Sequence, residues 1–124
     1  VLFGDHAPSG RLPVMIPTTA ADTIEPSEAA AVRYSEGMRT SYRSPSLKAA
    51  YPFGHGLTFT DFEYGAADVC TPGKDADVCL ELPVRNVGQI AAPTVVQLYV
   101  EFPAEAGHPS PLLKGFRKTA PIEP

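Results

Sequence analysis

The stretch Thr94-Val-Val-Gln-Leu-Tyr-Val-Glu-Phe102 decides the fold class of this chain. Every second residue from Val96 to Phe102 is apolar, and the residues between them are Gln97, Tyr99 and Glu101. Side chains alternate between the two faces of a β-strand, so a period of two predicts a half-buried antiparallel strand here.

Three other segments in the second half of the chain carry related patterns. In Val78-Cys-Leu-Glu-Leu-Pro-Val84 the alternation is clean, but Pro83 cannot donate to a ladder, which predicts an edge strand or a bulge. Residues 57–64 also alternate, with a phase slip that predicts a bulge or strand break near Thr60 and Asp61. A turn is expected at Asn86-Val-Gly88, and residues 112–119 form a weaker fourth candidate strand.

The first half of the chain predicts little regular structure. Prolines interrupt residues 1–26, and residues 35–52 are irregular apart from aromatic and Arg anchors, namely Tyr34, Arg39, Tyr42, Arg43 and Tyr51. Residues 27–34 have a helix-forming composition, with Ser27 as N-cap and Gly37 as stop, and predict one or two helical turns.

Together these patterns predict a mainly β protein, an incomplete β-sandwich preceded by an irregular, loop-rich segment. From Leu57 to the end the chain has 68 residues and about four candidate strands. A seven-stranded sandwich takes roughly 100 residues. We therefore expect the chain to end before the sandwich closes, leaving an exposed sheet edge and an uncovered apolar face.

Length and composition exclude several classes of protein. The 124 residues suit one small domain, and the formal charge of −4 offers no basic face for a nucleic acid. No apolar run reaches the roughly 20 residues of a membrane span, and no charged-then-apolar leader opens the chain. The chain starts at Val1, inside a hydrophobic stretch, which predicts a fragment of a longer protein.

The two cysteines, Cys70 and Cys79, are separated by eight residues of turn-like composition between strand-like runs. One interpretation is a disulfide that closes a hairpin in an exported protein. The other is a pair of free thiols acting as small apolar side chains. Two ligands at this spacing, with no His nearby in the sequence, do not make a zinc site.

Five segments, taken in order, resemble the C-terminal region of glycoside hydrolase family 3. They are Leu2-Phe-Gly-Asp-His-Ala-Pro-Ser-Gly-Arg-Leu-Pro-Val14, Tyr51-Pro-Phe-Gly-His-Gly-Leu-Thr-Phe-Thr60, Val84-Arg-Asn-Val-Gly88, Val95-Val-Gln-Leu-Tyr-Val100 and Leu113-Lys-Gly-Phe116. The resemblance implies that residues 1–52 are the tail of an α/β domain and a linker. Residues 53–124 would then be a fibronectin type III-like (immunoglobulin-like) sandwich without its last strands.

The resemblance also implies where catalysis occurs in the parent enzyme. The family uses an Asp of an N-terminal barrel as nucleophile and commonly a Glu of the second domain as acid/base, both upstream of this chain. None of the 14 carboxylates here lies in a matching motif, so we expect no catalytic, cofactor-binding or metal-binding residue. One departure concerns the turn before Tyr42, where family members often carry Gly and this chain has Ser41.

Four residues are candidates for an inter-domain or structural role. His55, between two glycines, could serve as acid, base or ligand, but we favour a structural His that bonds backbone across the inter-domain joint. Glu36, Arg39 and Arg43 form the densest charge group. They could line the mouth of a sugar site in the parent, and we favour an ion-pair network that fixes a loop.

The leading hypothesis is therefore a non-catalytic accessory region of a family 3 glycosidase, which hydrolyses terminal β-linked sugars such as glucose or xylose. Its partners would be the remaining domains of the parent, with self-association through the open sheet edge and no cofactor. The location would be secreted or extracytoplasmic. The alternative is a standalone fibronectin type III-like module that binds carbohydrate or protein. The chain has no Trp, which weakens the case for an aromatic sugar-binding surface.

Overall fold

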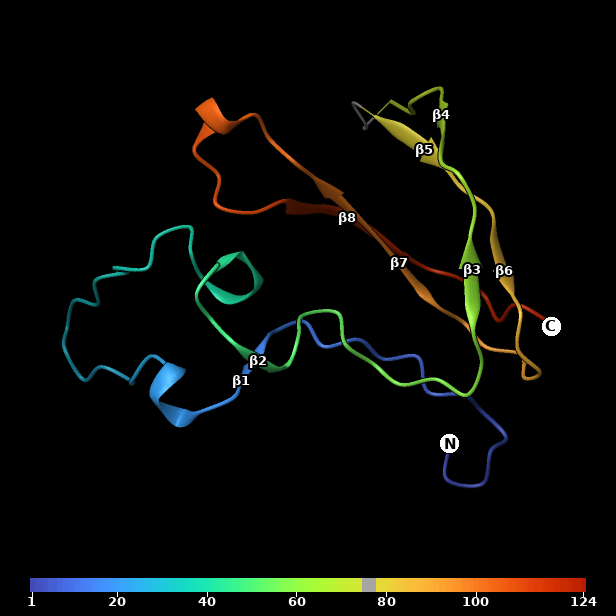
Figure 1. Cartoon of the computed structure of the whole chain (residues 1–124), viewed down its shortest axis with the longest axis horizontal. Helices are drawn as coiled ribbons and strands as arrows, with labels where there is room; N and C mark the ends of the chain where they lie inside the picture. The colour runs from blue at the N-terminus through green and yellow to red at the C-terminus, as the bar shows by residue number, and fades with distance from the viewer. Residues whose placement is uncertain (75–77) are drawn as a thin grey trace. The chain divides into compact units, whose positions relative to one another are not determined.

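Figure 1 shows the computed structural model of the chain, which describes residues 1–74 and 78–124. The described residues form eight short β-strands and three single-turn 3-10 helices. The strands are β1 (Ile16–Pro17), β2 (Ala49–Tyr51), β3 (Phe62–Tyr64), β4 (Asp68–Cys70), β5 (Cys79–Glu81), β6 (Val84–Asn86), β7 (Val95–Val100) and β8 (Leu112–Lys118). The 3-10 helices are η1 (Ala20–Asp22), η2 (Ser41–Arg43) and η3 (Ala104–Ala106). The mainly β, loop-rich prediction is confirmed.

The strands pair two by two, as β1–β2, β3–β6, β4–β5 and β7–β8. Strand β7 coincides with the alternating stretch at 94–102, and β8 with the weaker candidate strand at 112–119. Because each sheet described here has only two strands, every strand leaves one edge unpaired, as expected for an incomplete sandwich. No helix in the described part of the chain has the length and apolar character needed to cross a membrane.

The helix predicted at 27–34 is wrong. These residues form bends and extended backbone, and all of them are exposed. Ser27 does accept a hydrogen bond from the Ala29 N–H (3.2 Å), but no helix follows it. A helix of one or two turns is not stable without an apolar face packed on a partner, and this segment packs on nothing in the described chain.

The contacts divide the chain into two compact units. Unit 1 comprises Val1–Ser9, Leu57–Thr94 and Lys118–Pro124, and unit 2 comprises Gly10–Gly56 and Val95–Arg117. Unit 2 contains residues from both sides of the predicted domain boundary after residue 52. The division into domains 1–52 and 53–124 therefore stays a prediction.

A β-bulge interrupts the long hairpin of unit 1, in which β3 pairs with β6 and β4 with β5 (Figure 1). Tyr64 lies opposite Val84, whereas Asp68 lies opposite Glu81. Three residues (65–67) therefore face two (82–83), and one strand carries an extra residue. The break falls at Pro83, which cannot donate to the ladder, as the sequence predicts. The slip at Thr60–Asp61 is likewise a break, and β3 begins only at Phe62.

The buried centre of unit 1 is mostly polar and is organised by the Asn86 side chain. Its Oδ1 accepts hydrogen bonds from the Thr60 hydroxyl (2.6 Å) and the Gly88 N–H (3.1 Å). Its Nδ2 donates to the carbonyl oxygens of Ile90 (2.8 Å) and Ile122 (2.9 Å). A carboxamide has two donors and two acceptor sites, so Asn86 satisfies its full capacity while it is only 3% exposed.

The sequence analysis assigned Asn86 to a turn and missed this role. The signal lies in the alternation of the preceding strand, because Asn86 follows Leu80, Leu82 and Val84 at the same spacing of two. A polar residue at a position where the pattern calls for an apolar one is a candidate buried hydrogen-bonding group.

Two further contacts complete the centre of unit 1. Ala92 forms an antiparallel bridge with Ile122, and Thr94 pairs with Thr119, whose N–H donates to the Thr94 carbonyl (2.9 Å). The Tyr64 hydroxyl lies 3.0 Å from the Thr94 hydroxyl. Among the described residues, Ala92 is the one apolar residue that is fully buried. Hydrogen bonds therefore do much to hold the segments of unit 1 in place.

Two threonines near β3 provide a matched test of this polar centre. Thr60→Val removes the donor to Asn86 Oδ1 and is expected to lower the free energy of unfolding by about 1–2 kcal/mol. The buried hydroxyl of Thr58 has no hydrogen-bond partner among the described residues, so Thr58→Val is expected to be neutral or stabilising. Denaturant titrations of both variants measure the difference, and equal effects would contradict the assigned role of Asn86.

Candidate functional site

The loop of residues 34–43 contains three of the four candidate residues from the sequence. Within it the Gly37 N–H donates to the Tyr34 carbonyl (3.4 Å), and the Arg39 N–H donates to the Glu36 carbonyl (2.9 Å). The described residues contain no ion pair from Glu36 to Arg39 or Arg43; their charged pair is Arg85 with Glu63. The predicted ion-pair network is therefore absent, because long exposed side chains gain little free energy from pairing in water.

Tyr42 fixes the end of this loop to the rest of unit 2. Its ring centroid lies 4.6 Å from that of Phe53 and 5.9 Å from that of Tyr99 on β7. The N–H of Leu113, on β8, donates to the Tyr42 hydroxyl (3.0 Å). We call Tyr42, Phe53 and Tyr99 the aromatic cluster. Tyr42 is thus the anchor that the sequence predicts, whereas Tyr34 is 79% exposed and anchors nothing.

Ser41, directly before Tyr42, has a left-handed backbone conformation with a φ of 52°. Among the described residues it alone combines a side chain with a positive φ. This is the turn where the resemblance leads us to expect Gly, so the chain keeps the geometry without the residue that adopts it most easily. The Ser41 hydroxyl accepts a hydrogen bond from the Met15 N–H (3.3 Å), which offsets part of the strain.

His55 is held mainly through its backbone. Its N–H donates to the Pro52 carbonyl (3.0 Å), and its own carbonyl accepts the Leu12 N–H (2.8 Å). Its ring centroid lies 5.2 Å from that of Tyr51. Next to it, Gly54 has a φ of 79°, a left-handed conformation that is strained for any residue with a side chain, which favours glycine here. These contacts support a structural role within unit 2.

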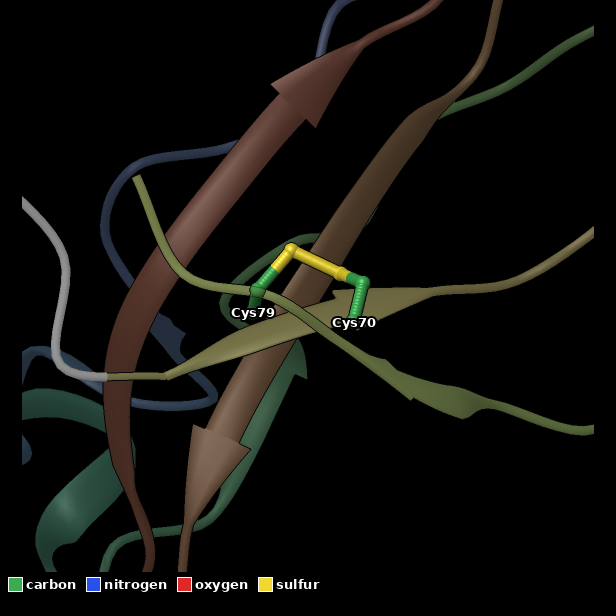
Figure 2. Close-up of a disulfide and its surroundings, with 2 residues drawn as sticks. All are labelled: Cys70 and Cys79. Carbon is green, nitrogen blue, oxygen red and sulfur yellow. A yellow bond between two sulfur atoms is a disulfide. The ribbon is translucent and has the colours of Figure 1, made fainter. Parts of the chain in front are cut away.

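Cys70 and Cys79 form a disulfide in the structure, and Figure 2 shows their sulfur atoms joined across β4 and β5. The two residues are directly opposed in the hairpin, with their Cα atoms 4.9 Å apart. The predicted turn between them includes residues 75–77, which lie outside the described residues. The cross-link closes the end of the hairpin beyond the bulge.

Burial raises the pKa of the Tyr99 phenol, and the nearby Tyr42 hydroxyl adds to the shift. The Tyr99 hydroxyl donates to Gln97 Oε1 (3.0 Å). No three His, Cys, Asp or Glu side chains among the described residues are grouped so that they could hold a metal ion.

Comparison with known proteins finds similar segments in larger enzymes. No protein-family model matches the chain. A thermostable β-glucosidase B from Acetivibrio thermocellus is 36% identical over 130 residues, a match that covers 95% of this chain and 17% of the relative. The chain thus spans about a sixth of the length of this curated relative.

Solved structures give the same result. A β-D-glucoside glucohydrolase from Trichoderma reesei matches all of the chain with a TM-score of 0.84 and 27% identity. A GH3 β-glucosidase from Bifidobacterium adolescentis matches 99% of it with a TM-score of 0.81 and 30% identity. These matches cover 20% and 19% of the two enzymes. The resemblance seen in the sequence is confirmed.

The left-handed conformation of Ser41 makes a prediction about two substitutions. At an ordinary position Ala stabilises a protein by roughly 0.5–1 kcal/mol relative to Gly. Here Ser41→Ala loses the hydrogen bond and keeps the strain, whereas Ser41→Gly loses the hydrogen bond and relieves the strain. We expect the Gly variant to be more stable by about 1 kcal/mol. Thermal unfolding of the two variants tests this, and an Ala variant that is the more stable would contradict the assigned geometry.

The disulfide makes a second prediction. The double variant Cys70→Ala with Cys79→Ala is expected to lose about 2.5–3 kcal/mol of unfolding free energy, as the chain-entropy model gives for a loop of about ten residues. Denaturant titration with and without a reductant measures the effect. The double variant is its own control, because the reductant should leave it unchanged. If the unfolding midpoint of the unmodified chain were the same with and without the reductant, the disulfide would be refuted.

Proposed function

Because the chain is homologous to a segment of glycoside hydrolase family 3 β-glucosidases, we propose that it is a non-catalytic accessory part of such an enzyme. Its role is to pack against the remaining domains of the parent and to brace them. The observation that carries this proposal is the combination of its share of the relatives, about a sixth of their length, with an apolar surface that the chain itself leaves uncovered.

The uncovered apolar surface is extensive in both units. Leu2 and Phe3 are 94% and 91% exposed, and Val69 and Phe116 are 84% and 75% exposed. Single exposed apolar side chains are ordinary in proteins. In the described part of this chain, however, many apolar side chains are exposed and one is fully buried, so the exposed ones need a covering partner. The other five sixths of a parent enzyme would supply it.

The chemistry of the described residues supports a bracing role. The aromatic cluster and the left-handed turn at Ser41 immobilise the loop of residues 34–43 against β7 and β8. The polar centre around Asn86 does the same for the turns of unit 1. In the family the reacting carboxylates belong to other domains, so this segment contributes rigidity and buried surface to the parent.

The reaction of the parent would be hydrolysis of terminal β-linked sugars such as glucose or xylose, in keeping with the β-glucosidase names of the relatives. Its partners would be the remaining domains of that enzyme. Without them, the free edges of the two-stranded sheets would promote self-association of the isolated chain.

We also propose a secreted or extracytoplasmic location. The support is the Cys70–Cys79 disulfide, because such cross-links persist in oxidising compartments and are rare in the cytosol. Alkylation of the protein in intact producing cells, followed by mass measurement, tests this. A fully reduced pair in the native source would overturn the proposed location.

The accessory role predicts two results for the purified chain. It should hydrolyse neither 4-nitrophenyl β-glucoside nor 4-nitrophenyl β-xyloside, and its folded form should bind an apolar fluorescent dye through the uncovered surface. The β-glucosidase from Acetivibrio thermocellus serves as the positive control for turnover. Sustained hydrolysis by the pure chain would show an enzyme. A folded monomer that binds no dye would instead favour the standalone binding module.

A further inference from the structure

One face of the β3–β6 pair carries an open depression. In an antiparallel pair, every second residue shares a face. Glu63 and Gly65 therefore share a face with Pro83 and Arg85, while Tyr64 points to the other side and reaches Thr94. Residues 63–65 with Pro83 and Arg85 line an open depression of about 330 Å³.

The floor of this depression lies where Gly65 faces Pro83, the last pair in the β3–β6 register before the β-bulge. The Gly65 N–H donates to the Pro83 carbonyl (2.9 Å), which brings the two residues into contact. A Cβ at Gly65 would collide with Cγ of the Pro83 ring. Because Gly65 has no side chain, the Pro83 ring stays uncovered and gives the depression an apolar floor.

The wall at one end consists of an exposed, loosely held ion pair. Arg85 Nη2 lies 3.7 Å from Glu63 Oε2, and the two side chains are 77% and 67% exposed. At this distance the guanidinium donors and the carboxylate acceptors remain largely free for other partners. The planar guanidinium of Arg85 can donate to one hydroxyl of a sugar ring, and the carboxylate of Glu63 beside it can accept from a neighbouring hydroxyl of the same ring.

We propose that this depression is a pyranoside-binding site. A pyranose ring has an apolar C–H face for the Pro83 floor and an equatorial rim of hydroxyls for Glu63 and Arg85. The volume is at the lower end of small-ligand sites, which suits one sugar unit. The site is shallow and open, so we expect weak binding. The choice of sugar rests on the proposed function, whereas the position of the site does not.

The test is a titration of the isotopically labelled 124-residue chain with methyl β-glucoside, followed through backbone amide resonances. Shifts should saturate and be confined to residues 63–65 and 84–85. Mannitol, which has the hydroxyls but no ring face, should cause no such shifts. Absence of saturable shifts up to the solubility limit, shifts located elsewhere, or equal shifts with mannitol would each overturn the site.

Two Arg variants give a matched pair. Arg85→Gln removes the charged, forked donor from the wall and should weaken glucoside binding by about tenfold. Arg33→Gln changes an exposed Arg in unit 2 and should leave the affinity unchanged. Equal affinity for the two variants would overturn the site. Because both side chains are exposed, an unchanged spectrum before titration confirms that each variant folds. The dye and hydrolysis results for the accessory role do not depend on these outcomes.

Discussion

The four hydrogen bonds of one carboxamide, that of Asn86, are the constraint on which the order of unit 1 depends. They join the segment before β3, the turn after β6, the following loop and the C-terminal segment at Ile122. No other uncharged side chain of this size offers two donors and two acceptors at a single point. An aliphatic residue at this position would leave two carbonyls, one hydroxyl and one N–H to find partners in a region closed to water, and each orphaned group costs free energy.

In this chain the strands are positioned by hydrogen bonds and other single contacts more than by the burial of apolar faces. In most small domains the strands are positioned by the apolar faces that they bury, and hydrogen bonds add direction. In the described part of this chain Ala92 is the one apolar residue that is fully buried, and the strands are two to seven residues long. Position is instead set by point contacts: the Asn86 amide, the Tyr42 hydroxyl, the Ser41 hydroxyl and the Cys70–Cys79 bond. Such contacts specify geometry well but contribute modest net free energy, which is why a partner surface is expected.

The sequence predicted the parts of the fold that follow from local rules. Period-two alternation located β7, the weaker candidate at 112–119 corresponds to β8, and the missing donor of Pro83 located the break between β5 and β6. The helix expected at 27–34 failed because composition alone does not stabilise a segment that buries no face. The alternation before Asn86 marks it as a candidate buried polar residue, but it does not identify the partners Thr60 and Ile122, which are 26 and 36 positions away. Among the candidate residues, Glu36, Arg39 and Arg43 were grouped by charge, whereas the structure orders their loop through Tyr42 and its ring contacts.

The extra residue of the β-bulge determines whether the disulfide can form at all. If the pairing of Tyr64 with Val84 continued without interruption, Cys70 would fall opposite Val78, and Cys79 opposite Val69. The observed offset of one places the two sulfurs on the same face of the hairpin. The disulfide can therefore form only in the observed register of the hairpin. If the pairing slipped by one residue, neither cysteine would lie opposite the other.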